Sequence, residues 1–212
     1  MNDNRNYSYN PNSYSQRAEY PIIADWIPAG SSVIDLGCGD GSLLHLLKTK
    51  GISGEGIEIS ESGVKTAKEK GLEVNQRRID TKLKFKNKQF NYAICNTSIQ
   101  MVMYPEIMLS EMVRISEKQI ISFPNFAFIL NRLELLLRGR MPKFMLYGYS
   151  WYSTGHIHQL SINDFRDYCK IARFKILDAK YYSPGGYSPL LTPLINLFPN
   201  SLALSAIFLT CK

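Results

Sequence analysis

The chain has 212 residues, of which 45% are hydrophobic and 20% charged, which excludes a disordered chain and suffices for one domain with a real core. Its net charge of +7 is compatible with an acidic partner but does not by itself indicate one. The four cysteines form no Cys-x-x-Cys pair, so we expect neither a metal site nor a disulfide framework, and we predict a cytoplasmic location.

The two ends of the chain differ in composition from its middle. Residues 1–14 are polar, carry no apolar stretch that would indicate a signal peptide, and are predicted to form a flexible arm. A single domain is predicted over 15–212. Residues 181–211 hold no charged side chain, but their prolines and glycines predict a loop and a short strand in place of a membrane span.

Predicted strands and helices alternate along the chain. The first helix is expected over 16–27, interrupted near Pro21. Further helices are expected over 41–50, 61–71, 105–116, 126–140 and 162–172. Strands are expected over 31–37, 54–60, 72–79, 90–96, 118–125, 173–182 and 201–211. The alternation predicts an α/β fold with a doubly wound, mostly parallel sheet, and the last two strands, with no helix between them, predict an antiparallel hairpin.

A glycine-rich loop, "DLGCGDG", joins the first predicted strand to the helix that begins near residue 41. In an open α/β sheet, ligands bind outside the carboxyl ends of the strands, where this loop would lie. The dinucleotide pattern Gly-x-Gly-x-x-Gly would need a third glycine where this chain has Ser42. Asp35 and Asp40 would also repel a pyrophosphate. The alternative to a ligand loop is a structural turn in which Asp40 caps the helix.

S-adenosylmethionine (SAM) suits this loop better than a dinucleotide does. It carries no phosphate, and its sulfonium and ammonium groups are positively charged. Glu58 ends the second predicted strand, where an acid can accept hydrogen bonds from both ribose hydroxyls. The loop, the spacing and the acid therefore agree on SAM.

At these residues the chain resembles the class I SAM-dependent methyltransferases, and within them the MetW family of methionine-biosynthesis proteins. The more specific stretches are "ISFPNF", "LLLRGRMP" and "WYSTGHIHQLSINDF". The resemblance implies a seven-stranded, Rossmann-like sheet with an antiparallel last strand, SAM as cofactor and S-adenosyl-L-homocysteine as product. It implies that the cofactor-binding residues are Asp35, Gly37, Cys38, Gly39, Asp40, Gly41, Glu58, Ile59, Asp80 and Asn96.

One departure from the family pattern concerns the adenine. After the third strand the family usually has a Gly-Asp pair, and here those positions are Arg77 and Arg78. An arginine cannot accept a hydrogen bond from the adenine amino group. Asp80, two residues later, is the candidate substitute, and the alternative is an adenine held by stacking alone.

His156 and His158 are the candidates for catalytic residues. They alternate in "TGHIHQL", so an extended segment would direct both side chains to one side, as a general base and a substrate binder. The alternative is a polar loop that hydrogen-bonds the helix opening at Ser161. The lysines of "KLKFKNK" are interpreted as a solvated edge, because too few aromatic residues accompany them to indicate RNA binding.

Two functions remain open at this point. In the first, the protein transfers a methyl group from SAM to an unidentified small molecule. In the second, which the resemblance implies, it is a non-catalytic or SAM-sensing accessory subunit of a homoserine O-acyltransferase. A nicotinamide-dependent oxidoreductase is a third and weaker hypothesis.

Overall fold

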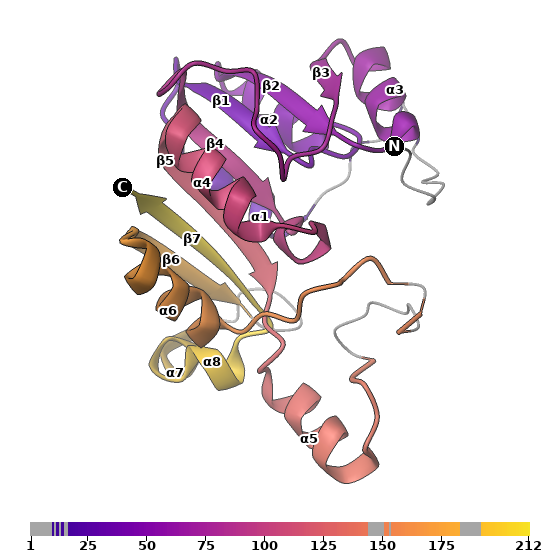
Figure 1. The fold of residues 1–212 in the computed structure, drawn as a ribbon, viewed down its shortest axis with the longest axis vertical. Coiled ribbons are helices and arrows are strands. Elements are labelled where there is room, and N and C mark those ends of the chain that lie inside the picture. Colours follow the sequence, from indigo (N-terminus) through magenta and orange to yellow (C-terminus); the bar gives the residue numbers. More distant parts are fainter. Residues whose placement is uncertain are drawn as a thin grey trace.

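The computed structural model describes residues 10, 12, 14, 17–143, 151, 152, 154–182 and 192–212. Most of the predicted arm lies outside these residues. A seven-stranded sheet with the strand order β3-β2-β1-β4-β5-β7-β6 runs through the centre (Figure 1). Its strands are β1 (Ser32–Leu36), β2 (Ser53–Glu58), β3 (Glu73–Gln76), β4 (Phe90–Asn96), β5 (Ser116–Pro124), β6 (Lys175–Tyr182) and β7 (Ser205–Cys211).

The strand directions confirm the predicted fold class. The pairs from β3 across to β5 are parallel. The last strand in the chain, β7, is antiparallel to both of its neighbours, β5 and β6. The sheet is therefore mixed and doubly wound, with its antiparallel strand inserted next to the edge.

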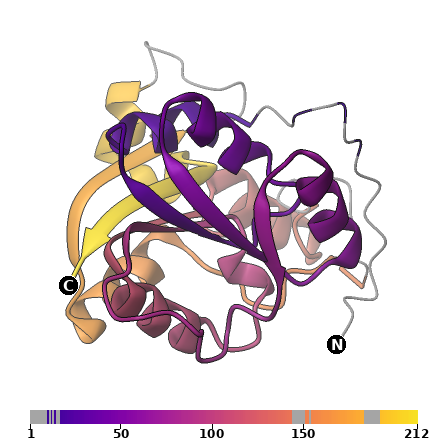
Figure 2. The ribbon, with the colours of Figure 1, turned by 90° about the horizontal axis from the view of Figure 1, so that it is seen from above.

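Helices cover both faces of the sheet (Figure 2). One face is covered by α1 (Glu19–Trp26), α2 (Ser42–Thr49) and α3 (Glu61–Glu69), and the other by α4 (Pro105–Ile115), α6 (Ile162–Ala172) and α7 (Thr192–Leu197). Adjacent residues of β1, Val33 and Ile34, belong to different cores, as the two-residue period of a strand requires. Each strand of the centre is thus buried on both sides.

The predicted interruption of the first helix at Pro21 is wrong. The helix α1 runs without a break from Glu19 to Trp26, with Pro21 in its first turn. There a proline is tolerated, because the N–H groups of the first turn have no acceptor within the helix.

The prediction that no helix separates the last two strands is also wrong. The helices α7 and α8 (Pro199–Leu202) both lie between β6 and β7. Pro193 and Pro199 stand in the first turns of these helices, where proline is favoured. We had expected these prolines to interrupt regular structure, and they instead lie where helices begin. None of the helices in the part of the chain that the structure describes is long and apolar enough to cross a membrane.

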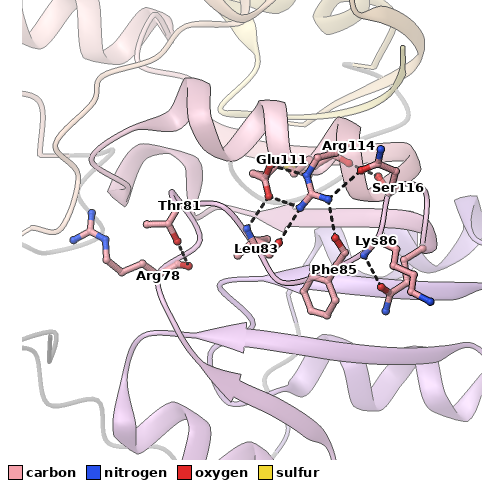
Figure 3. Close-up of polar contacts among 11 residues, drawn as sticks. Arg78, Thr81, Leu83, Phe85, Lys86, Glu111, Arg114 and Ser116 are labelled. Carbon is pink, nitrogen blue, oxygen red and sulfur yellow. Dashed lines mark hydrogen bonds and ion pairs between the residues drawn. The ribbon is translucent and has the colours of Figure 1, made fainter.

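The connection from β3 to β4 is held by two side chains of α4 (Figure 3). Glu111 accepts a hydrogen bond from the Leu83 N–H at 2.7 Å. Arg114 donates to the carbonyl oxygens of Leu83 at 2.9 Å and Phe85 at 2.7 Å, and it also pairs with Glu111 at 2.6 Å. The lysines that alternate with these residues are exposed, in agreement with the interpretation of a solvated edge.

The stretch "ISFPNF" has a structural role at the end of β5. The Asn125 side-chain amide donates to the carbonyl oxygen of Ala203 at 2.8 Å, just after α8. Its oxygen accepts from the N–H of Ala127 at 3.1 Å and of Ile162, the first residue of α6, at 3.3 Å. One fully buried side chain thereby joins three elements.

Candidate functional site

The glycine loop lies at the carboxyl end of β1 and turns sharply into α2. Gly37 and Gly41 have φ angles of 82° and 74°, in the left-handed region that favours glycine. A Cβ atom on Gly37 would lie 2.5 Å from the Ser98 Oγ. The N–H groups of Gly37 and Cys38 donate to the carbonyl oxygen of Ile57 at 2.8 and 3.1 Å, which ties the loop to β2. The turn and its close contacts therefore require glycine.

Glu58 stands at the carboxyl end of β2, directly beside the loop. One carboxylate oxygen accepts a hydrogen bond from the Gly39 N–H at 2.8 Å. The other accepts from the N–H groups of Ile59 and Ser60, both at 2.8 Å. Three backbone donors thus fix the orientation of the carboxylate and leave one of its roughly four lone-pair positions for a hydroxyl ligand.

Asp35 is the second acid of the site, and it is almost entirely buried. Burial, and then the negative charge of Glu58, raise the pKa of Asp35 to about 7. The guanidinium of Arg17 partly opposes this shift. Two carboxylates in a water-poor site repel an anion and favour a cation, which suits the sulfonium and ammonium groups of SAM and not a pyrophosphate.

Asp40 is occupied by structural contacts. Its two oxygens accept hydrogen bonds from the Ser42 N–H at 3.1 Å and from the Ser42 hydroxyl at 2.9 Å. The Lys70 ammonium, whose side chain is only 1% exposed, pairs with it at 2.8 Å. These contacts hold the turn before α2, whose N-cap residue is Gly41 and not Asp40, and the contact of Asp40 with a cofactor stays a prediction. Burial raises the pKa of the Cys38 thiol well above its usual value, so this thiol is uncharged at neutral pH.

The region before α1 adds residues that the sequence analysis did not single out. Arg17 pairs with the buried Glu19 at 2.9 Å, and its positive charge acts to lower the pKa of Asp35. The ring of Tyr14 stacks on His45, with the ring centroids 4.0 Å apart, and the Lys70 ammonium lies 4.7 Å from the Tyr14 ring centroid. No sequence motif marks these residues, because their contacts are made with elements far along the chain.

Asp80 carries four hydrogen bonds in the structure. Arg78 donates to it through Nε at 3.0 Å and through Nη2 at 2.7 Å. The N–H groups of Met103 and Tyr104 donate to one of its oxygens at 3.0 and 3.3 Å. Asp80 thereby fastens the segment after β3 to the start of α4. Its role as an adenine ligand stays a prediction, and its oxygens already have partners.

Asn96 ends β4 and is followed by an unusual backbone conformation. The Ser122 hydroxyl donates to the Asn96 side-chain oxygen. Thr97 has a φ of 56°, a left-handed conformation that is costly for a β-branched residue, and its N–H donates to the Ser122 carbonyl oxygen at 3.1 Å. Such strain is frequent at functional sites. Sequence reasoning missed Thr97, because nothing in its residue type signals a positive φ.

His156 and His158 lie on a segment that packs against the 3-10 helix η1 (Ile99–Met101), beyond the carboxyl end of β4. The N–H groups of Ile157 and His158 donate to the Gln100 carbonyl oxygen at 2.9 and 3.1 Å. The His158 ring is exposed and lies 3.3 Å from the Met103 carbonyl oxygen, whereas His156 is half-buried. No cluster of three or more metal-ligating side chains is found among the described residues.

The structure brings most of the predicted site residues to one edge of the sheet. The glycine loop, Glu58 and Asn96 follow β1, β2 and β4, which are neighbours in the sheet. The histidine segment joins this edge through Met103, which also contacts Asp80. A cofactor on the loop and an acceptor beside the histidines would therefore lie at the same end of the molecule.

Comparison with solved structures identifies the fold. A SAM-dependent methyltransferase from Mesorhizobium loti superposes with a TM-score of 0.68 at 16% identity, over 92% of this chain and 98% of the other. The magnesium protoporphyrin IX methyltransferase of Synechocystis, with bound S-adenosylhomocysteine, gives a TM-score of 0.65 at 20% identity, over 91% of this chain and 81% of the other. The protein has the class I methyltransferase fold.

Comparison of sequences identifies the family. The bifunctional methionine biosynthesis protein MetXA/MetW of Rhodopirellula baltica is 30% identical over 178 residues, which cover 79% of this chain and 29% of that protein. The chain therefore spans less than a third of the length of this relative. The family model for the methionine biosynthesis protein MetW matches residues 17–210. The protein belongs to the MetW family.

Proposed function

We propose that the protein binds SAM on the glycine loop and transfers its methyl group to a small molecule. The observation that carries this proposal is the pair of carboxylates beside the loop, Asp35 and Glu58. Burial and the charge of Glu58 raise the pKa of Asp35 to about 7, so a cationic ligand relieves a repulsion that an anionic ligand would increase.

Each residue of the site has a stated part in binding. Glu58, oriented by its three backbone donors, accepts a hydrogen bond from a ribose hydroxyl at its remaining position. Asp35 lies near the amino group of the methionine part, and the backbone of Gly37–Gly41 contacts that part. Arg17 lies close enough to Asp35 to influence its charge, and it balances the carboxylate of the methionine part.

The adenine is held mainly by stacking. The oxygens of Asp80 already accept from Arg78, Met103 and Tyr104, so the adenine amino group would have to displace or share one of these partners. Ile59 is half-buried beside Glu58 and offers an apolar contact.

When bound, SAM supplies an electrophilic methyl group on a sulfonium. The chain aligns the acceptor with that group and excludes water, which is the main contribution to an in-line displacement. An acceptor aligned in this way would form its new bond with a lone pair, and the electron pair of the carbon–sulfur bond would remain on sulfur. His158 takes the proton that the acceptor loses, and His156 contacts the acceptor.

Calorimetric titration of SAM tests the cofactor site. We expect Glu58→Ala to weaken binding at least tenfold, and Glu58→Gln less, because an amide oxygen can still accept from Ile59 and Ser60. Glu55→Ala, a change of a partly buried acid on the same strand, is the matched control and leaves the affinity unchanged. Unchanged SAM affinity in Glu58→Ala, or binding of NADH in place of SAM, would refute the assignment.

Transfer is tested separately from binding. The protein is incubated with methyl-labelled SAM and an extract of its source cells, with His158→Ala alongside. Label in a discrete product that depends on His158 supports the enzyme. No labelled product, together with intact SAM binding, would favour an accessory role.

One observation favours a second candidate function, association with a homoserine O-acyltransferase. The relative from Rhodopirellula baltica is named as a bifunctional MetXA/MetW protein. The part of it that matches this chain covers 29% of its length. In this alternative the SAM site is a sensor that modulates a partner enzyme. The acyltransferase activity of that partner, measured with and without this protein and SAM, tests it.

A further inference from the structure

The helix α5 (Ile129–Arg138) exposes most of its apolar side chains. It projects from the body of the molecule (Figure 1) and contributes to neither of the two cores. Its one buried residue is polar, Asn131, whose amide donates to the Phe126 carbonyl oxygen at 3.2 Å. Leu136 and Leu137 are 80% and 77% exposed. Asn131 therefore faces the protein, whereas the leucines of the helix are exposed and face outward.

The outward leucines form a continuous surface. Leu130, Leu133 and Leu137 follow one another at helical spacing, so they share a face. Together with Lys143 and two charged residues of the helix they line a hollow of about 490 Å³. A helix of this length is only marginally stable in water by itself, and most helices are stabilised by burying their apolar face. A contiguous exposed apolar surface of this kind marks an interaction site.

The rim of this surface is basic. Arg138, Arg140 and Lys143 are exposed around the leucines. The acid of the helix, Glu134, already accepts from the Lys143 N–H at 3.0 Å and lies 3.8 Å from Arg138. The complementary surface on a partner is an apolar groove with an acidic rim.

We propose that the outward face of α5 docks against a homoserine O-acyltransferase subunit. This inference rests on the association proposed above and names the surface that makes it. The name of the Rhodopirellula baltica relative joins MetXA and MetW in one protein, so the two parts occur together there at high effective concentration. The stretch "LLLRGRMP", which contains Leu136 and Leu137, is also one of those by which the chain resembles the MetW family.

The test compares three forms of the full chain in binding to the homoserine O-acyltransferase encoded by the same organism. The wild-type chain is expected to bind, and the double variant Leu136→Glu/Leu137→Glu to bind at least tenfold more weakly. Ile171→Glu is the matched control, since Ile171 is an 83% exposed apolar residue on α6, and its affinity should not change. SAM titration of all three forms confirms that the fold is intact.

The possible outcomes separate this inference from the proposals on which it depends. Equal binding by the double variant would place the interface elsewhere and leave the association standing. No binding by the wild-type chain, or a genome without such an acyltransferase, would refute both the association and its surface, while SAM binding would be unaffected. A wild-type dimer that the double variant dissociates, or wild-type sedimentation with phosphatidylglycerol vesicles, with acyltransferase affinity unchanged, would show that another occupant covers α5.

Discussion

Two buried aspartates near the same edge of the sheet have opposite environments. Asp80 is 4% exposed, and although burial favours its neutral form, the Arg78 guanidinium and the Tyr104 N–H lower its pKa overall. Asp35 is 2% exposed, and burial and the charge of Glu58 raise its pKa to about 7. The fold uses Asp80 to fasten two segments together. Ionised Asp35 destabilises the folded protein, and a cationic ligand beside it would offset this cost.

Replacing Asp35 gives the largest expected effect. An unfolded aspartate ionises near pH 4, whereas Asp35 in the folded protein ionises near pH 7, so the folded state loses stability as the pH rises through this window. Asp35→Asn removes this cost. We expect it to raise the free energy of unfolding at pH 8 by up to about 4 kcal/mol and to change it little at pH 4.

Urea denaturation at both pH values measures this effect. Asp25→Asn, at an exposed acid paired with Lys50, is the control and should show no such pH dependence. Equal stability of Asp35→Asn and the wild-type protein at pH 8 would contradict the raised pKa of Asp35 and its contrast with Asp80.

Replacing Asp80 should act in the opposite direction. Asp80→Ala removes the acceptor of the Met103 and Tyr104 N–H groups and the ion pair with Arg78, which we expect to cost about 2–3 kcal/mol of stability. Thermal denaturation at neutral pH measures it, with Asp167→Ala, at an exposed ion pair with Lys170, as the control. A variant that keeps its stability but loses SAM binding would assign Asp80 to the adenine instead.

The pH dependence of SAM affinity gives the smallest effect. The ionised form of Asp35 is the one that attracts the ammonium group, and its population rises about tenfold between pH 6 and pH 8 if the pKa is about 7. We therefore expect SAM affinity to rise by about tenfold over this range. In Asp35→Asn the same calorimetric titrations should give a flat profile, and a flat profile in the wild-type protein would contradict the role of Asp35.

The sequence predicted those parts of the site that depend on local rules. Glycines at tight turns and an acid at the end of a strand have signatures in a single chain, and Gly37, Gly41 and Glu58 lie where expected. The seven strands and the antiparallel β7 agree with what the resemblance implies. The two prolines that begin α7 and α8 misled the prediction, because the same residue breaks a helix or starts one according to its position.

The rest of the site depends on contacts between distant segments. Asp80 is engaged by residues 23 and 24 positions away, which no spacing rule reveals. The left-handed conformation of Thr97, whose N–H contacts Ser122, has the same origin. Helical periodicity locates an apolar face, but it does not say whether that face turns toward the core or away from it.

The position of β7 bears on how the chain is made. This strand is the last in the sequence, yet it lies between β5 and β6, and its pairing with them holds β6 to the sheet. During synthesis the amino-terminal half emerges first, so β1 to β5 can assemble while β6 has no partner. The β6 edge and the apolar surface of α6 must wait until residues 205–211 leave the ribosome. A nascent chain stalled shortly before this point would expose both the unpaired strand edge and the apolar surface, which are features that promote aggregation.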